Sequence, residues 1–264
     1  MRSIHKYKNL FQHIQNPFEY IFNKSKRRHR SLQMVTRPHP IHFEVTAALY
    51  PVFKEVFMED VYEIDQLAAR LPDTGIVLDI GANGGFFDCI LLSKKPGLKI
   101  HAFEPLPANV QALERLVHNN PTLQDRMMVS GVAVTGKKID HIELFIESES
   151  EHSVVASSVS HFDERNKSSI QVPTITFAEI LAPLKTDEIA LLKIDCEGSE
   201  YDIFYNTPVE LIQKIPFISA EVHDLDKETM NLQYFSNVLK GWGYHITHRP
   251  INGFCHALEA TRKK

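Results

Sequence analysis

Acidic side chains follow two apolar segments of this chain, at positions where they could bind a sugar. Asp79 stands near the end of the run Ile76–Ile80, and Glu104 comes 25 residues later, directly after Lys99–Phe103. Short apolar runs of this kind are typical of buried parallel strands. An acidic group at the end of the second such strand can accept both hydroxyls of a ribose. Asp79 and Glu104 together therefore predict a nucleoside site.

The turn that follows Asp79 is rich in glycine. Gly81, Gly84 and Gly85 precede the helix-compatible sequence FFDCILL. Glycine permits a positive φ and lets the backbone approach a ligand that any Cβ would displace. The spacing differs from the G-x-G-x-x-G of dinucleotide sites, which leaves a dinucleotide oxidoreductase as a minor alternative. The pattern favours a strand, a ligand-binding turn and a helix whose amides face the same cleft as the Asp79 carboxylate.

Five further groups with acid–base chemistry lie at the ends of two later apolar runs, Ile189–Ile194 and Phe217–Val222. The first run leads into the sequence DCEGSE, and the second ends in EVH. In an open α/β sheet, ligands bind at the carboxyl ends of the strands. We therefore expect these groups at one rim of the sheet: Asp195, Glu197, Glu200, Glu221 and His223.

The elements that must position these groups are predicted by apolar periodicity. Strands and helices alternate, which is typical of a mostly parallel sheet with helices on both faces. Further helices are predicted within 43–71, where they would roof the cleft, and at 108–119, 177–181 and 227–239. Further strands are predicted at 127–134, 139–146, 172–176, 244–247 and 254–259.

The first 40 residues differ in charge from the rest of the chain. They hold nine of the 29 Lys and Arg residues but only Glu19 of the 33 acidic ones, which leaves 20 basic against 32 acidic residues in the remainder. Apolar residues at helix-like spacing run from Ile4 to Ile21 with a break at Pro17, and a basic cluster follows at 24–30. We expect residues 1–40 to form a basic amphipathic arm. It packs on its own domain or on a second copy of the chain, and contact with an anionic membrane or a phosphate-rich partner stays open.

The length of 264 residues and the composition favour one large α/β domain over residues 41–264. Cys89, Cys196 and Cys255 are odd in number and far apart, so we expect reduced thiols in a cytoplasmic protein. The sequence shows no signal peptide and no apolar run of membrane-spanning length.

The acidic body of the chain argues against a nucleic-acid partner. The polar segment 148–169 predicts a substrate lid.

These motifs resemble the FkbM-type family of class I S-adenosylmethionine-dependent methyltransferases. The matching segments are VLDIGANGGFF, AFEPLPANV, VPTITFAEIL, LLKIDCEGSEYDIF and FISAEVHDL, which together cover about residues 60–225. The resemblance implies an α/β, Rossmann-like fold: a seven-stranded, mostly parallel sheet with helices on both faces and a C-terminal antiparallel hairpin. It also implies S-adenosyl-L-methionine as cofactor and S-adenosyl-L-homocysteine as product.

The resemblance also implies the roles of the site residues. The loop around the methionine part of the cofactor comprises Asp79, Gly81, Asn83 and Gly85. Glu104 binds the ribose, Val132 and Ala133 lie near the adenine, and Tyr62 belongs to the segment that passes over the cleft. The transferable methyl is bordered by Asp195, Glu197, Glu200, Glu221 and His223, and Asp195 also contacts the cofactor.

The chemistry implied is O-methylation of a hydroxyl on a small molecule or glycan in a biosynthetic pathway. The hydroxyl proton must leave, and His223 is the natural base because its ordinary pKa of about 6.5 lies near neutrality. Asp195 or Glu221 could orient His223 or take the proton instead. We assign no metal. A divalent ion on Asp195, Glu197, Glu221 and His223 nevertheless stays open.

Two alternative functions remain at this stage. The same fold could methylate a nitrogen, or a side chain of a peptide or protein. A protein of another class would use residues 1–40 to dock on a membrane or polyanion and would carry a vestigial nucleoside pocket. Intact Asp79, Glu104 and Asp195 argue against the vestigial pocket.

Overall fold

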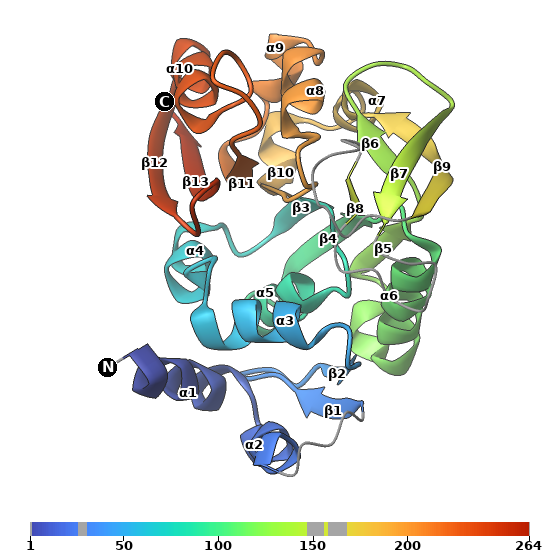
Figure 1. The fold of residues 1–264 in the computed structure, drawn as a ribbon, viewed down its shortest axis with the longest axis vertical. Coiled ribbons are helices and arrows are strands. Elements are labelled where there is room, and N and C mark those ends of the chain that lie inside the picture. Colours follow the sequence, from blue (N-terminus) through green and yellow to red (C-terminus); the bar gives the residue numbers. More distant parts are fainter. Residues whose placement is uncertain (1, 26–30, 147–155, 158–167, 264) are drawn as a thin grey trace.

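A central sheet of seven strands organises the structure (Figure 1). The structure is a computed structural model that describes residues 2–25, 31–146, 156–157 and 168–263, so most of the predicted lid lies outside the described residues. The strand order is β12-β13-β11-β10-β3-β4-β5. The bounds are β3 Gly75–Ile80, β4 Leu98–Phe103, β5 Met127–Ser130, β10 Ile189–Ile194, β11 Phe217–His223, β12 Tyr244–Pro250 and β13 Cys255–Arg262.

Five neighbouring strands of this sheet, from β11 to β5, run parallel. Strand β13 is antiparallel to both β11 and β12. All six residues of β10 are buried, because a central parallel strand is covered on both faces and is therefore continuously apolar. The predicted fold, a mostly parallel seven-stranded sheet that ends in an antiparallel hairpin, is confirmed.

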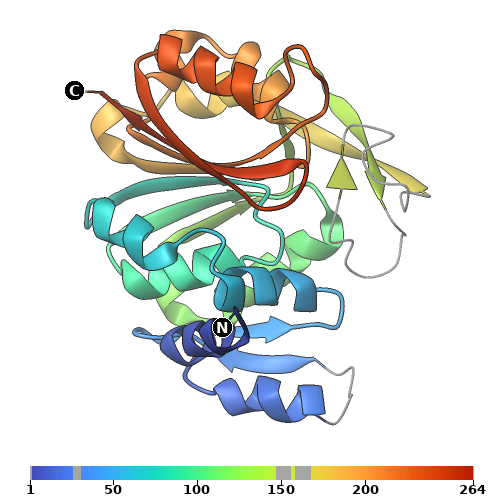
Figure 2. The ribbon, with the colours of Figure 1, turned by 60° about the vertical axis from the view of Figure 1, so that its left-hand side comes forward.

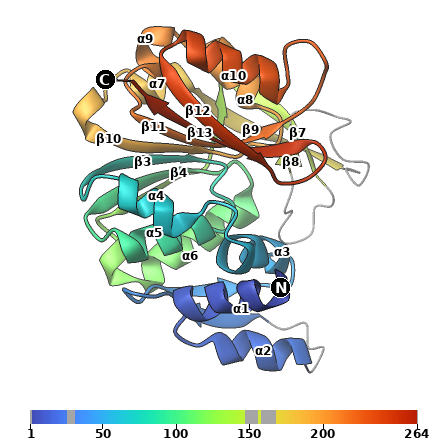
Figure 3. The ribbon, with the colours of Figure 1, turned by 90° about the vertical axis from the view of Figure 1, so that its left-hand side faces the viewer.

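Helices cover both faces of the sheet (Figure 3). One face carries α4 Ile64–Arg70, α5 Phe86–Lys94 and α6 Pro107–Asn119, and the other carries α7 Phe177–Leu181, α8 Glu200–Tyr205, α9 Val209–Ile212 and α10 Leu232–Gly241. Successive residues of a strand point to opposite faces. Accordingly, Val77 belongs to the apolar core on one side of β3 and Leu78 to the core on the other.

A second sheet of four strands, β6-β9-β7-β8, stands beside the central one. Its bounds are β6 Ala133–Thr135, β7 His141–Ile146, β8 Ala156–Ser157 and β9 Ser168–Thr176. The prediction of a single strand over 127–134 is wrong, because this segment divides between β5 and β6. The Val132 amide donates to the Ser130 carbonyl at 3.0 Å, a tight turn that passes the chain from one sheet to the other.

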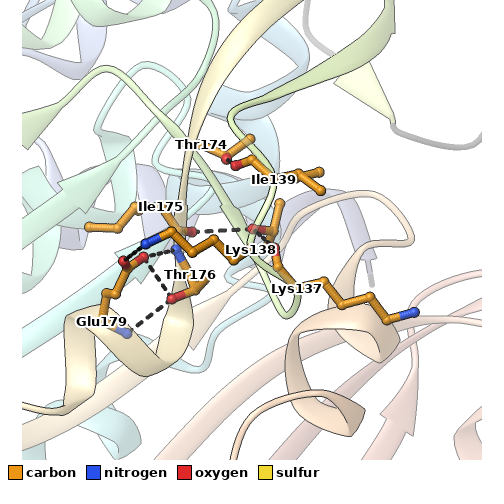
Figure 4. Close-up of polar contacts among 8 residues, drawn as sticks. Lys137, Lys138, Ile139, Thr174, Ile175, Thr176 and Glu179 are labelled. Carbon is orange, nitrogen blue, oxygen red and sulfur yellow. Dashed lines mark hydrogen bonds and ion pairs between the residues drawn. The ribbon is translucent and has the colours of Figure 1, made fainter.

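Polar contacts fix the junction between the second sheet and α7 (Figure 4). The Thr176 hydroxyl accepts the Glu179 amide at 3.2 Å, and the Glu179 carboxylate accepts the Thr176 amide at 3.0 Å. This reciprocal capping box ends β9 and starts the helix. Lys138, in the turn between β6 and β7, lies 3.3 Å from the same carboxylate.

Two predicted helical segments begin later than their periodicity indicated. Within 43–71, the chain first forms β2 His42–Val45, followed by α3 Tyr50–Lys54, the π-helix η1 Glu55–Glu59 and then α4. Within 227–239, helix α10 starts only at Leu232. The Asp226 carboxylate accepts the amides of residues 228, 229 and 230 and holds them in a turn, and Asn231 caps the helix by accepting the Tyr234 amide at 2.9 Å.

The N-terminal elements lie against the helices of one face and form a layer of their own (Figure 2). They are α1 Arg2–His13, α2 Pro17–Ser25, β1 Leu32–Val35 and β2, which pairs antiparallel with β1. Leu10 and Ile14 are completely buried, and Asn9 donates to the Met58 carbonyl at 3.0 Å. The arm therefore packs on its own domain.

The outer face of this arm carries large apolar side chains. Ile4, Phe11, Phe18 and Phe22 are between 40% and 77% exposed. Most of the basic cluster at 24–30 lies outside the described residues. The predicted contact with a second copy of the chain or with an anionic membrane stays a prediction.

Leu10→Ala should test the packing of the arm. Removal of a fully buried leucine side chain leaves a cavity, so we expect the free energy of unfolding to fall by about 2–5 kcal/mol. Ile4→Ala is the matched control, because this side chain is 77% exposed and its loss should change stability by less than about 0.5 kcal/mol. Denaturant unfolding measures both, and equal effects would show that the arm does not share the core.

Candidate functional site

A cleft of about 1020 Å³, counted with the space at its mouth, opens at the carboxyl ends of β3, β4 and β10. This is the place where open α/β sheets bind ligands. Predicted site residues that line it are Tyr62, Gly81, Asn83, Glu104, Val132, Ala133, Asp195 and Glu197. Asp79, Gly85, Glu200, Glu221 and His223 do not line it.

The glycine turn between β3 and α5 serves contacts within the protein. Gly81 has φ +82°, and a Cβ there would stand 1.8 Å from the Asp195 carbonyl oxygen. Gly85 has φ +74°, and its Cβ would meet the side chains of Leu113 and Leu116 at 2.7 and 2.9 Å. The sequence-based explanation, close approach to a ligand, is therefore incomplete. Glycine at 81 first of all lets the ends of β3 and β10 approach each other.

Glu104 is buried at the end of β4, with 4% of its surface exposed. Its carboxylate accepts the amides of Asn83 at 2.8 Å and Leu106 at 2.9 Å, and the Asn109 side chain at 3.3 Å. Burial raises the pKa of Glu104, and these hydrogen bonds oppose the rise. A carboxylate has about four acceptor positions, so one remains for a ligand hydroxyl.

A buried ion pair lies beneath the cleft. Lys193 Nζ is 3.0 Å from Asp79 Oδ1 and donates to the Gly81 carbonyl at 2.8 Å. Burial lowers the pKa of Lys193, but Asp79 and Asp195 outweigh it and the pKa is raised. Asp88 is completely buried, and burial together with the Asp79 charge raises its pKa well above the usual range. This rise favours the protonated form of Asp88.

Sequence analysis missed Lys193 and Asp88. The predicted contact of Asp79 with the cofactor stays a prediction. In the structure Asp79 is buried and pairs with Lys193, which itself lines the cleft. A signal for both was present: a lone lysine in the apolar strand IALLKI and a lone aspartate in the apolar helix FFDCILL. A charged residue at such a position is almost never buried without a partner.

Acidic groups surround the far end of the cleft. Tyr62 donates to Asp195 Oδ2 at 3.4 Å. Burial, Asp195 and Glu59 together raise the pKa of Glu55 to about 7. Burial and Asp195 raise the pKa of Glu197 to about 8. Burial is the main cause of both shifts and the charge of Asp195 adds to it, so this end of the cleft favours the neutral forms of Glu55 and Glu197 unless a cationic group lies nearby.

His223 lies behind this rim, at the end of β11. Its Nδ1 is 2.7 Å from Glu200 Oε1, and its Nε2 is 3.5 Å from Glu197 Oε2. Burial lowers the pKa of His223, but hydrogen bonds to Cys255 and Glu200 raise it to about 12. Burial and Asp195 raise the pKa of Glu221 well above its usual range. The structure thus brings together His223, Glu197, Glu200 and Glu221, as expected from sequence, and adds Cys255.

The strand order, the cleft at the strand ends and the acidic group after the second strand define a class I methyltransferase fold. Consistent with this, residues 79–246 match the family model described as the methyltransferase FkbM domain. That match covers more than half of the chain. The chain belongs to the FkbM methyltransferase family.

Two curated relatives show how far the similarity extends. The 31-O-demethyl-FK506 methyltransferase FkbM of Streptomyces tacrolimicus is 24% identical over 197 residues, covering 66% of this chain and 75% of the relative. The AMB antimetabolite synthetase AmbE of Pseudomonas aeruginosa is 24% identical over 231 residues, covering 75% of this chain. The chain spans only 11% of the length of AmbE.

A solved structure agrees on the fold. The FkbM methyltransferase of Methylobacillus flagellatus superimposes with a TM-score of 0.50 at 17% identity, covering 81% of this chain and 54% of that one. Among the described residues, no helix has both the length and the apolar character needed to cross a membrane.

Lys193→Met should test the ion pair beneath the cleft. Removing the cation leaves the buried Asp79 carboxylate without its partner, so we expect the free energy of unfolding to fall by about 3–5 kcal/mol. Lys99→Met, on the exposed side of β4, is the control and should change stability by less than about 0.5 kcal/mol. Denaturant titration compares the two. A loss in Lys193→Met no greater than in the control would contradict a stabilising pair.

Glu55→Gln should reveal the raised pKa of Glu55. The folded protein binds the Glu55 proton more tightly than the unfolded chain, so this group makes the wild type less stable as pH rises from about 4.5 to about 7. The glutamine variant lacks this loss and should gain on the wild type by on the order of 2 kcal/mol across that window. Unfolding of both proteins is measured at several pH values, with Glu114→Gln on α6 as control. A difference that stays constant with pH would refute the assignment.

Proposed function

We propose that this chain binds S-adenosyl-L-methionine in the cleft and methylates a hydroxyl of a small molecule or glycan. The observation that carries the proposal is Glu104, held by three donors at the end of β4 with an acceptor position left over. Val132 and Ala133 supply an apolar wall nearby, which suits an adenine. When bound, this cofactor supplies a methyl on a sulfonium, whose sulfur keeps the electron pair as the methyl bonds to the acceptor oxygen.

The acidic rim suits the rest of this chemistry. Asp195 and Glu197 line the cleft. In their charged form, these carboxylates would stabilise a cationic group nearby. A cleft-lining carboxylate is also placed to take the proton that a hydroxyl acceptor must lose. His223, which does not line the cleft, would then act through Glu197, 3.5 Å away.

The acceptor is proposed from this chemistry together with one relative. The name of the Streptomyces relative describes methylation at an oxygen. N-methylation, or methylation of a peptide or protein, is the second candidate, and the acidic rim would also accommodate an amine. Incubation with methyl-deuterated S-adenosylmethionine and matched alcohol, amine and peptide acceptors, read by mass spectrometry, separates these candidates. Label on amines or peptides alone would overturn the assignment to hydroxyls.

Glu104→Gln should weaken cofactor binding without removing the side chain. The amide loses one acceptor oxygen, so we expect the affinity for S-adenosylhomocysteine to fall about ten- to a hundredfold. Glu114→Gln, exposed on α6, is the matched control and should bind like the wild type. Calorimetry measures all three proteins, and thermal melting confirms that each is folded. Unchanged affinity in the folded Glu104→Gln protein would remove Glu104 from the cofactor site.

A further inference from the structure

Three side chains that can ligate metals meet where β11 pairs with β13. His223 and Cys255 are directly opposed in this antiparallel pair, and Glu221 stands two residues before His223. Opposed residues share a face of the sheet, and so do residues two apart on one strand. One ligand atom from each of the three lies within 4.8 Å of the others, and all three residues are buried.

We propose that Glu221, His223 and Cys255 form a binding site for zinc or a divalent ion of similar ligand preference. Thiolate, imidazole and carboxylate are all normal zinc ligands, whereas a thiolate disfavours magnesium and calcium. Tetrahedral zinc with bonds of about 2.0–2.3 Å holds its ligand atoms about 3.3–3.8 Å apart. Inward side-chain movement of about 1 Å therefore closes the site.

Glu200 supplies the orienting contact that histidine ligands ordinarily have. Its Oε1 lies 2.7 Å from His223 Nδ1, and its side chain is completely buried. A carboxylate on one ring nitrogen fixes the tautomer and orients the other nitrogen toward a metal. The other nitrogen of His223 is Nε2, which lies 3.5 Å from Glu197 Oε2.

The charges around His223 also favour a cation. The carboxylates of Glu197 and Glu200 both lie beside this one imidazole, and Glu221 Oε2 accepts from Cys255 Sγ at 3.6 Å. The nearby ammonium of Lys193 is already paired with Asp79. Buried carboxylates are costly unless a cation or hydrogen-bond donors compensate them. A divalent ion would do so in place of the His223 proton, which metal binding releases.

The position of the site suggests how it would act. Three protein ligands with a further open position are the pattern of catalytic rather than structural zinc. Glu197 both lines the cleft and contacts His223, so the open position lies toward the acceptor end. An acceptor hydroxyl bound there would have a lowered pKa. This consequence rests on the proposed function, whereas the metal site itself does not.

The test is metal binding by the full chain. Protein purified from zinc-supplemented culture should hold about one zinc per chain by elemental analysis. After chelation, added zinc should raise the melting temperature. Cobalt should produce the charge-transfer absorption of a thiolate–cobalt bond, a readout that requires no variant. Wild-type protein that binds neither ion would overturn the site.

Variants locate the ligands. Cys255→Ala should lose the cobalt charge-transfer band and at least about tenfold in zinc affinity, and Glu200→Gln should lose about 10–100-fold. His256→Ala is the control, because His256 adjoins Cys255 in the chain but bonds instead to Asp224 at 3.0 Å. The control should keep the metal. A Cys255→Ala protein that retains the band and the affinity would contradict the proposal, whatever the methyl-transfer result.

Discussion

The ion pair between Lys193 and Asp79 is the interaction on which the site depends. The two residues are register partners on the adjacent parallel strands β10 and β3, and they are 3% and 0% exposed. The Lys193 ammonium also binds the Gly81 carbonyl, so a single cation joins both strand ends to the turn that lines the cleft. A buried charge is tolerated only when it is paired and hydrogen-bonded. Movement of either strand end would break this pairing, so the pair holds the floor of the cleft in one arrangement.

The same constraint explains the composition of the turn. Asp195 follows β10 directly, and its carbonyl oxygen approaches Gly81 so closely that any side chain at 81 would collide with it. Asp195 also receives the Tyr62 hydroxyl at 3.4 Å. Segments that are distant in the sequence therefore meet at one point. The close packing of the ends of β3 and β10 therefore determines both the glycine in the turn and the position of Asp195 on the acidic rim.

Local sequence patterns predicted the strands and the turn in which burial or backbone conformation restricts the choice of residue. The apolar runs of β3, β4 and β10 and the glycine turn were recognisable because burial on both faces and positive φ restrict residue choice. The resemblance to the FkbM family supplied the cofactor roles of Glu104 and Val132, which both line the cleft. The division of 127–134 between two sheets was missed, because a single hydrogen bond at Val132 decides it.

The contacts that could not be predicted from the sequence are those between residues that are far apart in the chain and that strand pairing brings together. His223 faces Cys255 only because β13 returns antiparallel to β11 in one register, and no local pattern specifies that register. Lys193 was visible as a lone charge in an apolar strand, but its partner was not. Glu200 was expected at the methyl group, whereas it lies behind the cleft on His223. Residues that line the cleft were thus easier to predict than the residues that hold them in place.

The account's central claim is that the cleft between Glu104 and Asp195 holds the methyl donor. The most direct measurement is a crystal structure of the protein soaked with S-adenosylhomocysteine. We expect the ribose within hydrogen-bond distance of Glu104, the adenine against Val132 and Ala133, and the sulfur toward Asp195 and Glu197. Nucleoside density elsewhere on the protein, or an unchanged cleft at saturating ligand, would contradict the account.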